Sequence, residues 1–489
     1  MKLPRISRLF VLLLSAAASC TTVTVKPRQV DALPRIWPDY TNVTVPAGIA
    51  PLNFSMADSA FVRMSVLVSG SKGGSLEIDA REEVQFPERK WHELLQANKD
   101  GMLSVIVCAK DAEGWKRFVP FCIYVSGDDC DYGLCYRLIP PGYVNWGHMR
   151  ICERDLSSFR ERTLVDNKGW RGCVNCHSFN RCSPDDFSFH VRGEHGATVL
   201  RSRGHLDAYN TRTDSTLGFC VYPYWHPGGD WIAYSSNTTR QHFHTTLDKL
   251  IEVFDIESDV YIYNVRSGRL HRPPLTSSRS MNESFPAFSA DGRTLYFTAA
   301  PSDAALPVMQ TRYNLYSVGF DPESGEVGGE QEPVVVVDAA ALGKSVAHPR
   351  PSFDGRFLIY TLSDYGTFPV WHPESDLWIL DLRSGKSRPL TEINSRTAAD
   401  SYHNWSSNSR WLVFGSRRLD GAYTRPFIAH VDENGRCGKP FLLPQKSPRL
   451  YYLEQMNSYN IPEFVTGPVD FESRRTMDLI LSPDRTPFL

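Results

Sequence analysis

The sequence lacks an excess of charge of either sign and, beyond its N-terminus, it lacks a long apolar run. Its 489 residues carry 53 basic and 55 acidic side chains, which gives a formal net charge of −2. A chain without a net positive field is not suited to nucleic acid, so the sequence excludes that class of partner. No later apolar run is long enough to cross a bilayer as a helix.

Familiar catalytic signatures are also missing. The chain contains no G-x-S-x-G motif, no paired-carboxylate motif and no phosphate-binding loop, which favours an electron-transfer or binding protein over an enzyme. Aromatic residues, at 12%, and cysteine, with 11 residues, are abundant instead. A cytosolic chain seldom keeps so many thiols without a metal or redox use, so the cellular compartment is the first question.

The N-terminus answers it. Residues 2–8 carry three basic side chains, residues 9–14 are apolar, and small residues lead to Cys20. This pattern predicts a signal peptide over residues 1–19. The run Ala17-Ala18-Ser19-Cys20 resembles a bacterial lipobox, which implies export, cleavage before Cys20 and a lipid anchor on its thiol. Ordinary secretory cleavage is the alternative, and Thr21 after the cysteine favours the outer membrane.

The remaining chain divides by its patterns. Residues 20–52 are rich in Val, Thr and Pro without a helical period and are interpreted as an extended tether. Residues 53–128 alternate β-branched and aromatic runs with turn residues, which predicts a small β-sandwich. Residues 129–194 are interpreted as a connecting region, and residues 195–489 contain an internal repeat.

The repeat predicts the fold of the larger part. An aromatic residue or proline, a serine or His-Pro, a turn and an apolar strand recur at 224–235, 287–298, 350–361 and 404–415. The Asp-Gly pair in two of these segments suits a hairpin turn, because glycine accepts the positive φ that such turns require. Short strands that repeat in this way are typical of the blades of a β-propeller.

These segments resemble the TolB-like propeller repeat, with its Pro-x-x-Ser-Pro-Asp-Gly run. The match is good around Ser289 and Ser352, whereas His226-Pro227-Gly228-Gly229 varies the run and Ser407-Asn408-Ser409 lacks the glycine. The resemblance implies an all-β fold: a TolB-like β-propeller of six blades, with seven as the alternative, beside the small N-terminal β-sandwich. TolB itself carries an α/β domain, so its role is not transferred to this chain.

One motif indicates chemistry. Cys173-Val174-Asn175-Cys176-His177 is a C-x-x-C-H, the attachment pattern of c-type haem. Two thiols at this spacing reach the two vinyl groups of one porphyrin edge, and the adjoining histidine reaches the iron. The motif therefore predicts one covalent haem c, held by Cys173 and Cys176, with His177 as an iron ligand.

The second axial ligand is less clear from the sequence. The first methionine after the motif is Met281, which is distant, whereas His190 and His195 are near. His190 is the preferred iron ligand because it lies in an alternating apolar run, and bis-histidine ligation lowers the potential relative to a His/Met site. A structural role for His190 and an open iron position are the alternatives.

Two other interpretations of the motif stay open. Cys173 and Cys176 form a disulfide in one, and both bind zinc with Cys182 and His177 or His190 in the other. Removing Cys20 and the two motif cysteines leaves eight, of which Cys108 with Cys122 and Cys130 with Cys135 are local pairs suited to disulfides.

The predicted propeller channel offers a weaker candidate site. His348 and His403 precede corresponding inner-strand segments, which approach the channel of a propeller. TolB-like propellers include pectate-fragment lyases with channel histidines and a divalent metal, so the resemblance implies a possible metal site here. Ordinary polar lining of the channel is the alternative.

The sequence around Gly172–Phe179 also resembles the C-x-x-C-H-containing, TolB-like lipoproteins of Bacteroidota genomes. That resemblance implies no settled activity. Three hypotheses follow: electron transfer or redox sensing with an envelope partner, a cofactor-free scaffold that binds envelope proteins or glycans, and a metal-dependent carbohydrate enzyme that uses the channel.

Overall fold

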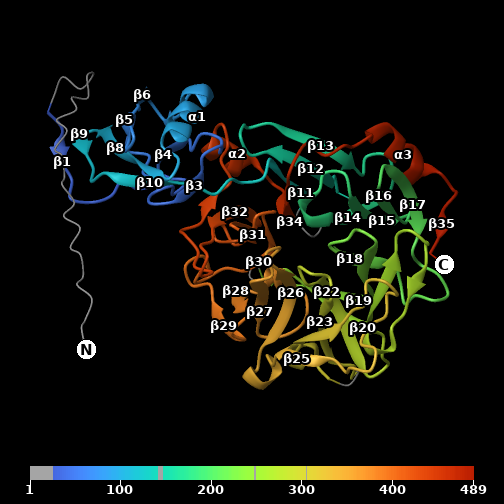
Figure 1. Cartoon of the computed structure of the whole chain (residues 1–489). Coiled ribbons are helices and arrows are strands. Elements are labelled where there is room, and N and C mark those ends of the chain that lie inside the picture. The colour runs from blue at the N-terminus through green and yellow to red at the C-terminus, as the bar shows by residue number, and fades with distance from the viewer. Residues whose placement is uncertain (1–25, 141–146, 247–248, 304–305, 489) are drawn as a thin grey trace, which may run out of the picture.

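A computed structural model describes residues 26–140, 147–246, 249–303 and 306–488. The predicted signal peptide and Cys20 lie outside these residues. Figure 1 shows a small N-terminal part at one side of a larger ring of sheets. No helix in the described ranges is long and apolar enough to cross a membrane.

The ring contains six antiparallel sheets within the described residues, and each has a core of four strands. Five follow one another along the chain. Their strands are β14 (Gly172–Phe179), β15 (Phe187–Gly193), β16 (Ala197–Ser202) and β17 (His205–Asn210); β18 (Cys220–Trp225), β19 (Trp231–Phe243), β20 (Ile251–Asn264) and β21 (Leu270–His271); β22 (Met281–Phe288), β23 (Thr294–Pro301), β24 (Asn314–Gly319) and β25 (Val334–Val337); β26 (Ser345–Pro351), β27 (Phe357–Ser363), β28 (Asp376–Asp381) and β29 (Lys386–Pro389); and β30 (Asp400–Trp405), β31 (Trp411–Ser416), β32 (Arg425–His430) and β33 (Phe441–Leu442).

The sixth sheet joins distant parts of the chain. It comprises β11 (Gly133–Ile139), β12 (Arg150–Asp155), β13 (Glu161–Asp166) and, from near the C-terminus, β34 (Ser458–Val465). β34 pairs antiparallel with β11. One edge strand of each sheet, termed its first strand, contacts the first strand of the next sheet. The closed order of these first strands is β14, β18, β22, β26, β30 and β34. This arrangement is consistent with the expected β-propeller (Figure 1).

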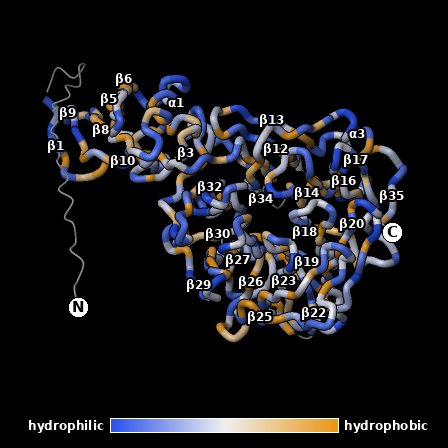
Figure 2. The backbone as a smooth tube through the Cα atoms, in the orientation of Figure 1, coloured by the Kyte–Doolittle hydropathy of each residue, from blue (hydrophilic) through white to orange (hydrophobic). Residues whose placement is uncertain are grey.

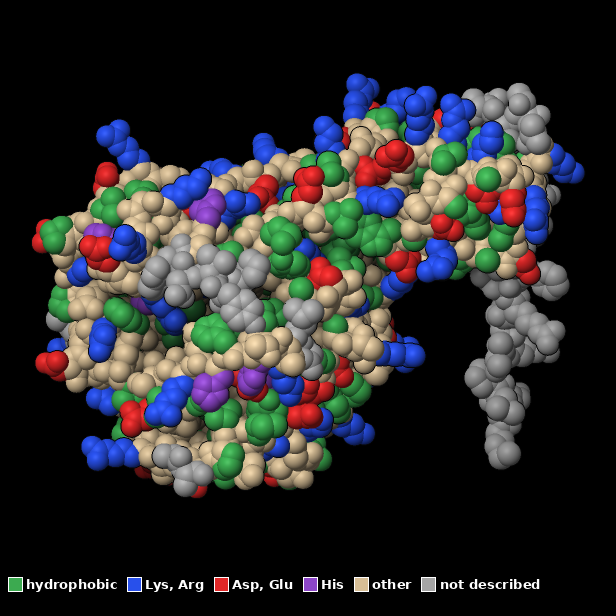
Figure 3. Space-filling model, turned by 180° about the vertical axis from the view of Figure 1, so that it is seen from behind, with side chains coloured by type: hydrophobic (Ala, Val, Ile, Leu, Met, Phe, Trp, Pro, Cys, Tyr) green, Lys and Arg blue, Asp and Glu red, His purple; other side chains and the backbone are tan. Residues whose placement is uncertain are grey.

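Hydropathy follows the sheets. In Figure 2 the hydrophobic stretches gather in the strands of the ring, and hydrophilic stretches lie in the outer loops. On the face shown in Figure 3, acidic and basic side chains intermingle, as the net charge of −2 leads one to expect. The Asp-Gly turns also form as the sequence indicates, because Gly292 and Gly355 have φ of 72° and 70°.

The interpretation of residues 129–194 as a connecting region is wrong. This segment supplies three strands of the sixth sheet and the first two of the next, so the ring starts at Gly133 rather than at residue 195. The error has a physical reason. β11 completes its pairing only with β34, more than 300 residues away, and no local pattern reports such a partner.

Each first strand of the ring contains the same bulge. One residue in each has a positive φ, between 47° and 53°, at a shift in the register with the neighbouring strand. These bulge residues are Cys176, Tyr222, Phe285, His348, Tyr402 and Ile461. The next residue is proline in four strands, at 223, 286, 349 and 462, and histidine in two, at 177 and 403. The C-x-x-C-H motif thus coincides with a backbone feature that all six sheets share.

The N-terminal part contains two sheets and a helix. A seven-stranded sheet and a three-stranded sheet share one buried cluster with the helix. The elements are β1 (Arg28–Gln29), β3 (Thr44–Pro46), β5 (Arg63–Gly70), β6 (Ser75–Ala80), β8 (Gly101–Asp111), β9 (Gly114–Arg117) and β10 (Phe121–Ser126) in the first sheet, β2 (Ile36–Trp37), β4 (Phe54–Met56) and β7 (Glu83–Val84) in the second, and the helix α1 (Glu88–Ala97).

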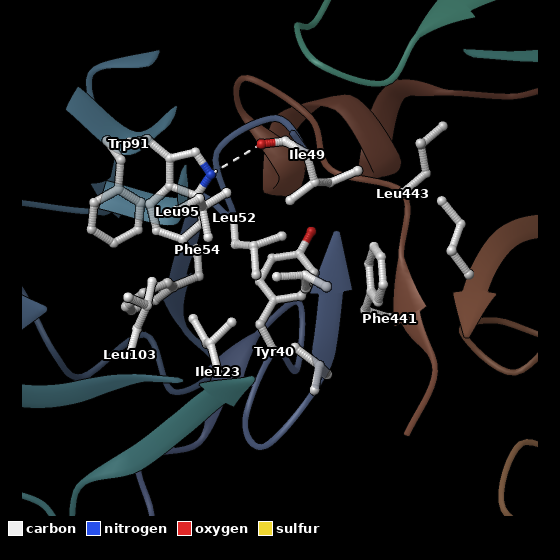
Figure 4. Packing of buried hydrophobic residues seen from close by; sticks show 14 of the residues in the cluster. Tyr40, Ile49, Leu52, Phe54, Trp91, Leu95, Leu103, Ile123, Phe441 and Leu443 are labelled. Carbon is white, nitrogen blue, oxygen red and sulfur yellow. Dashed lines mark hydrogen bonds between the residues drawn. The ribbon is translucent and has the colours of Figure 1, made fainter. Parts of the chain in front are cut away.

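The interpretation of residues 20–52 as an extended tether is wrong from residue 28 onward. β1 and β3 pair in parallel with β9 and β10. Tyr40, Ile49 and Leu52 are each 1% exposed. Figure 4 shows them in the buried cluster with Trp91, whose indole Nε1 donates to the Ile49 carbonyl oxygen at 3.1 Å. The run Thr44-Val45-Pro46 forms the short edge strand β3, whose partner β10 lies far along the sequence.

The N-terminal part is fixed to the ring through the same cluster. Phe441 and Leu443 of the ring pack beside Tyr40 and Ile49 (Figure 4). The Tyr40 hydroxyl donates to the Leu442 carbonyl oxygen at 3.3 Å. The two parts therefore share a core.

Three further elements follow or flank β34. The helix α2 (Pro448–Glu454) precedes it, and α3 (Ser473–Leu481) and β35 (Thr486–Pro487) follow it. β35 pairs in parallel with β17 and extends that sheet to five strands.

The repeated bulge yields a prediction for His177. Because proline occupies the equivalent position in four other strands, His177→Pro is expected to fold and to change the free energy of unfolding by less than ~1 kcal/mol. Urea denaturation followed by circular dichroism measures it. Val174→Pro is the control, since Val174 is 0% exposed and pairs with Val191 inside the ladder, and it is expected to destabilise strongly. Equal damage from both substitutions contradicts the shared bulge.

Candidate functional site

The first candidate is the C-x-x-C-H motif, which lies entirely in β14. Cys173 is half-buried and pairs across the ladder with Arg192. Cys176 is the bulge residue and is 7% exposed. Burial raises the pKa of the Tyr222 and Tyr402 hydroxyls, and Cys176 is close enough to raise both pKa values further. Cys176 therefore faces the centre of the ring.

His177 lies against the neighbouring sheet. It is 4% exposed, and burial lowers its pKa to about 4, helped by the charge of Arg137. The backbone carbonyl groups of Ile461 and Cys135 oppose this shift in pKa, although neither completes a hydrogen bond to the ring. The imidazole is thus a neutral group between two sheets.

His403, on β30, has surroundings equivalent to those of His177. Burial lowers its pKa to about 3, and the carbonyl groups of Ile359 and His348 oppose the shift. In both cases the carbonyls belong to the preceding sheet, one from its bulge residue and one from its second strand. His177 and His403 therefore occupy one structural position in the repeat.

His190 lies on β15, directly across the ladder from Asn175. Its Nδ1 is 3.1 Å from the Thr198 hydroxyl, and its ring centroid is 5.0 Å from that of Phe219. Burial lowers its pKa to about 3, with a contribution from the charge of Arg192. The structure gives His190 packing partners of its own on β15 and β16.

These residues do not fit a covalently attached haem. Cys173 lies in the regular ladder opposite Arg192, whereas Cys176 lies at the bulge with a φ of 48°. The space is also filled, because Val174, Cys176 and His177 are 0%, 7% and 4% exposed against protein atoms. A macrocycle here would displace the contacts between two sheets of the ring.

The structure also does not support the two alternative interpretations of the cysteines, a disulfide and a zinc site. The cysteines from Cys122 onward are free thiols, so neither Cys173–Cys176 nor the local pairs form disulfides. Cys182 directs its thiol to the Trp405 carbonyl oxygen at 3.5 Å. Among the described residues, no group of three or more His, Cys, Asp or Glu side chains is arranged to hold a metal ion.

The second candidate pair, His348 and His403, occupies adjacent but different positions. His348 is a bulge residue, and its ring centroid lies 4.4 Å from that of Phe285 and 4.7 Å from that of Tyr402. Tyr222 contacts Phe285 in turn, at 4.6 Å. The bulge side chains thus form a mostly aromatic plug at the centre of the ring. Burial lowers the pKa of His348 well below its usual value, so the plug carries no charge from this ring.

A cavity lies on one side of this plug. Its volume is ≈ 50 Å³, and residues from all six first strands line it. Two residues after the bulge, four of these strands contribute Ser178, Tyr224, Arg350 and Asn404, and β34 contributes Glu463. The repeat therefore directs the bulge residue into the plug and the second residue after it into the cavity.

Arg350 and Glu463 are the charged residues of the first strands in this cavity. The Arg350 guanidinium donates from Nε to the Asn404 side-chain oxygen at 3.0 Å and from Nη1 to the Pro349 carbonyl oxygen at 3.1 Å. It also lies 5.4 Å from the Tyr224 ring centroid. Burial lowers its pKa, and the nearby Tyr224 and Glu463 oppose that shift.

Glu463 is 9% exposed. Its Oε2 accepts a hydrogen bond from the Phe179 backbone N–H at 3.1 Å. Burial raises its pKa to about 8, against the lowering effects of Arg350 and of the Phe179 N–H. Within the described residues, no ion pair joins Arg350 and Glu463 at 4.0 Å or less, although both face one cavity.

Sequence reasoning did not find Arg350, Asn404 or Glu463. The signal was present, because Arg350 and Asn404 begin two of the four repeated segments at a position where the others have tyrosine and alanine. His177-Ser178-Phe179 and Pro462-Glu463-Phe464 continue the same pattern in the two strands that were not recognised. A charged residue at a repeat position that faces the ring axis marks a candidate binding residue.

The poor fit to haem yields a second prediction. Production in a host that matures c-type cytochromes is expected to give protein without covalent haem, measured by the pyridine haemochrome spectrum of the denatured chain. A cytochrome c made in the same cells is the positive control. A haem band that survives denaturation and disappears in Cys173→Ser and Cys176→Ser contradicts this expectation.

Comparisons with known proteins describe the fold only. No protein-family model and no curated protein matches the chain. Prolyl oligopeptidase B from Galerina marginata is similar over 62% of this chain and 43% of its own, at 12% identity and a TM-score of 0.35. Porphyromonas gingivalis dipeptidyl peptidase 4 matches over 60% and 48%, at 10% and 0.28. A DUF4784 family protein from Bacteroides caccae matches over 73% and 95%, at 10% and 0.30.

The chain thus spans less than half the length of the first two of these proteins. Their identities and TM-scores describe a distant likeness of fold and carry no statement about activity. The chain is similar in structure to the β-propeller domains of such peptidases.

Proposed function

We propose that this chain is an exported, lipid-anchored binding protein of the cell envelope, without a haem, whose six-bladed, TolB-like propeller receives its ligand in the cavity beside the plug. One observation carries the proposal. Arg350 and Glu463 face the same cavity, and each has polar capacity that no ion pair between them uses. Convergent polar groups with shifted pKa values in a concave site are a common mark of a ligand pocket.

The construction of the cavity supports this function. Its walls combine the aromatic rings of Trp225, Phe288, Phe353 and Trp405 with the few polar groups described above. Trp225 and Trp405 are each fixed by an indole hydrogen bond, to the carbonyl oxygens of Ser178 at 3.3 Å and of Arg350 at 3.0 Å. Apolar walls with few, fixed polar groups are typical of specific binding sites.

The proposed location rests on the sequence. If Cys20 carries lipid, seven residues separate it from Arg28, where β1 begins. That linker extends at most roughly 25 Å, which would hold the N-terminal part close to the membrane. An envelope protein or a glycan is then the class of partner that the cavity would meet.

The other two hypotheses have less support. Electron transfer or redox sensing through haem c requires Cys173, Cys176 and His177 to leave a packed strand. A metal-dependent carbohydrate enzyme requires His348 and His403 to share a metal, yet one lies in the plug and the other against the preceding sheet. The binding hypothesis requires no such rearrangement.

Filling the cavity tests the proposal. Ala290 lines the cavity, and Ala290→Phe is expected to weaken ligand binding at least tenfold while the melting temperature stays close to that of the wild type. Saturation-transfer NMR against short peptides and envelope-derived oligosaccharides measures binding. Ala60→Phe, at an exposed residue of the N-terminal part, is the control. No bound compound, or equal binding by both variants, contradicts the proposed function.

A further inference from the structure

A second arginine lines the cavity. Arg181 lies in the short helix η1 (Asn180–Cys182) and donates from Nη2 to the Phe353 carbonyl oxygen at 3.3 Å. Its guanidinium carbon lies 5.4 Å from the Phe353 ring centroid. Among the described residues, neither Arg181 nor Arg350 has a carboxylate within the 4.0 Å of an ion pair. Two guanidinium groups thus border one small space without a counter-ion.

Glu463 does not neutralise this space at neutral pH. It is the one acid among the residues that line the cavity. Because burial raises its pKa to about 8, most of its carboxyl groups are protonated and uncharged at pH 7. The cavity is then bordered by the guanidinium groups of Arg350 and of the exposed Arg181, an amide at Asn404 and a neutral acid.

We propose that the cavity binds a carboxylate group, presented by a small ligand or by the end of a longer chain, between the guanidinium groups of Arg350 and Arg181. The planar fork of arginine matches a carboxylate and binds it with two parallel hydrogen bonds. The remainder of the ligand would lie on Phe353 and Trp225. This inference rests on the proposed function and adds the chemical class of the ligand.

The size of the cavity sets what can enter. A volume of ≈ 50 Å³ admits a few waters or a compact head group but no complete drug-sized molecule. A planar carboxylate fits this volume when the remainder of the ligand lies outside the cavity. Two sources have this chemistry in the envelope: the C-terminus of a peptide and the acid group of a sugar.

Protonation of Glu463 makes the affinity depend on pH. The groups that act on Glu463 or border it are Arg350 from β26, Tyr224 from β18, Arg181 and Cys182 from η1, and Cys135 from β11. Burial raises the pKa of Tyr224 to about 12 and keeps the two cysteines protonated. Glu463 is therefore the group that gains a charge between pH 7 and pH 9, and its negative charge opposes a bound carboxylate.

The experiment compares matched ligands on the full-length protein. N-acetylglycine and glucuronate, a peptide end and a sugar acid, are titrated by isothermal calorimetry beside their neutral amides. At least one acid is expected to bind and its amide to bind at least tenfold more weakly. For the wild type, affinity is expected to fall about tenfold from pH 7 to pH 9.

Matched variants assign the effect to the cavity. Arg350→Gln and Arg181→Gln are each expected to weaken binding of the acid at least tenfold. Arg356→Gln is the control, because Arg356 pairs with Asp381 at 2.8 Å outside the cavity. Arg181 makes one exposed hydrogen bond, so its variant tests the proposal even if Arg350→Gln does not fold. Glu463→Gln is expected to bind like the wild type at pH 7 and to keep that affinity at pH 9.

Three outcomes overturn the inference: equal binding of acids and amides, no effect of either arginine substitution, or loss of binding in Glu463→Gln at pH 7, which would indicate a cationic ligand. Its failure is distinguishable from failure of the proposed function. A neutral ligand that binds the wild type but not Ala290→Phe overturns the carboxylate and keeps the binding cavity. Absence of any ligand sensitive to Ala290→Phe removes both.

Discussion

The pairing of β34 with β11 is the constraint on which the ring depends. Every residue of β34 is buried. Its ladder with β11 pairs Leu134 with Phe464 and Leu138 with Tyr459, and this pairing closes the ring. Without this pairing, two sheets would expose unpaired backbone groups, which a closed ring avoids. The closure also contributes to the candidate site, because Ile461 and Glu463 of β34 complete the plug and the cavity. Ring and candidate site are therefore stabilised together.

The shared bulge explains how one backbone presents different chemistry. Bulge residues from neighbouring first strands contact one another at the centre. The next residue lies toward the preceding sheet at His177 and His403, and the residue after it lines the cavity in five of the six strands. Prolines at the middle position suit a backbone that needs no hydrogen-bond donor there, and His177 and His403 replace them without changing the bulge. The side chains can thus vary with little effect on the sheets, and this variation gives the cavity its charges.

The sequence predicted the repeat but not its extent. Four of six first strands were recognisable because a turn and an apolar strand follow each at short range. The remaining two were hidden for different reasons. β34 precedes no second strand of its own, since its partner lies near the start of the ring. β14 carries a C-x-x-C-H whose local spacing is typical of haem attachment, and only the structure shows that this motif lies within a largely buried strand. The buried β3 and its flanks were likewise hidden, because their partners are distant in sequence.

The separation of Arg350 from Glu463 is the strongest physical argument for a ligand. Burying charged groups without pairing them lowers stability, and a direct ion pair would reduce that loss. The fold limits the loss in another way: burial keeps Glu463 mostly neutral at pH 7, and Asn404 and the Pro349 carbonyl hold the Arg350 guanidinium. The guanidinium is then solvated on one side by the protein and open on the other to the cavity. A group held in that state binds an incoming carboxylate without first breaking an internal ion pair, so the energy of the interaction goes to the ligand rather than to the fold.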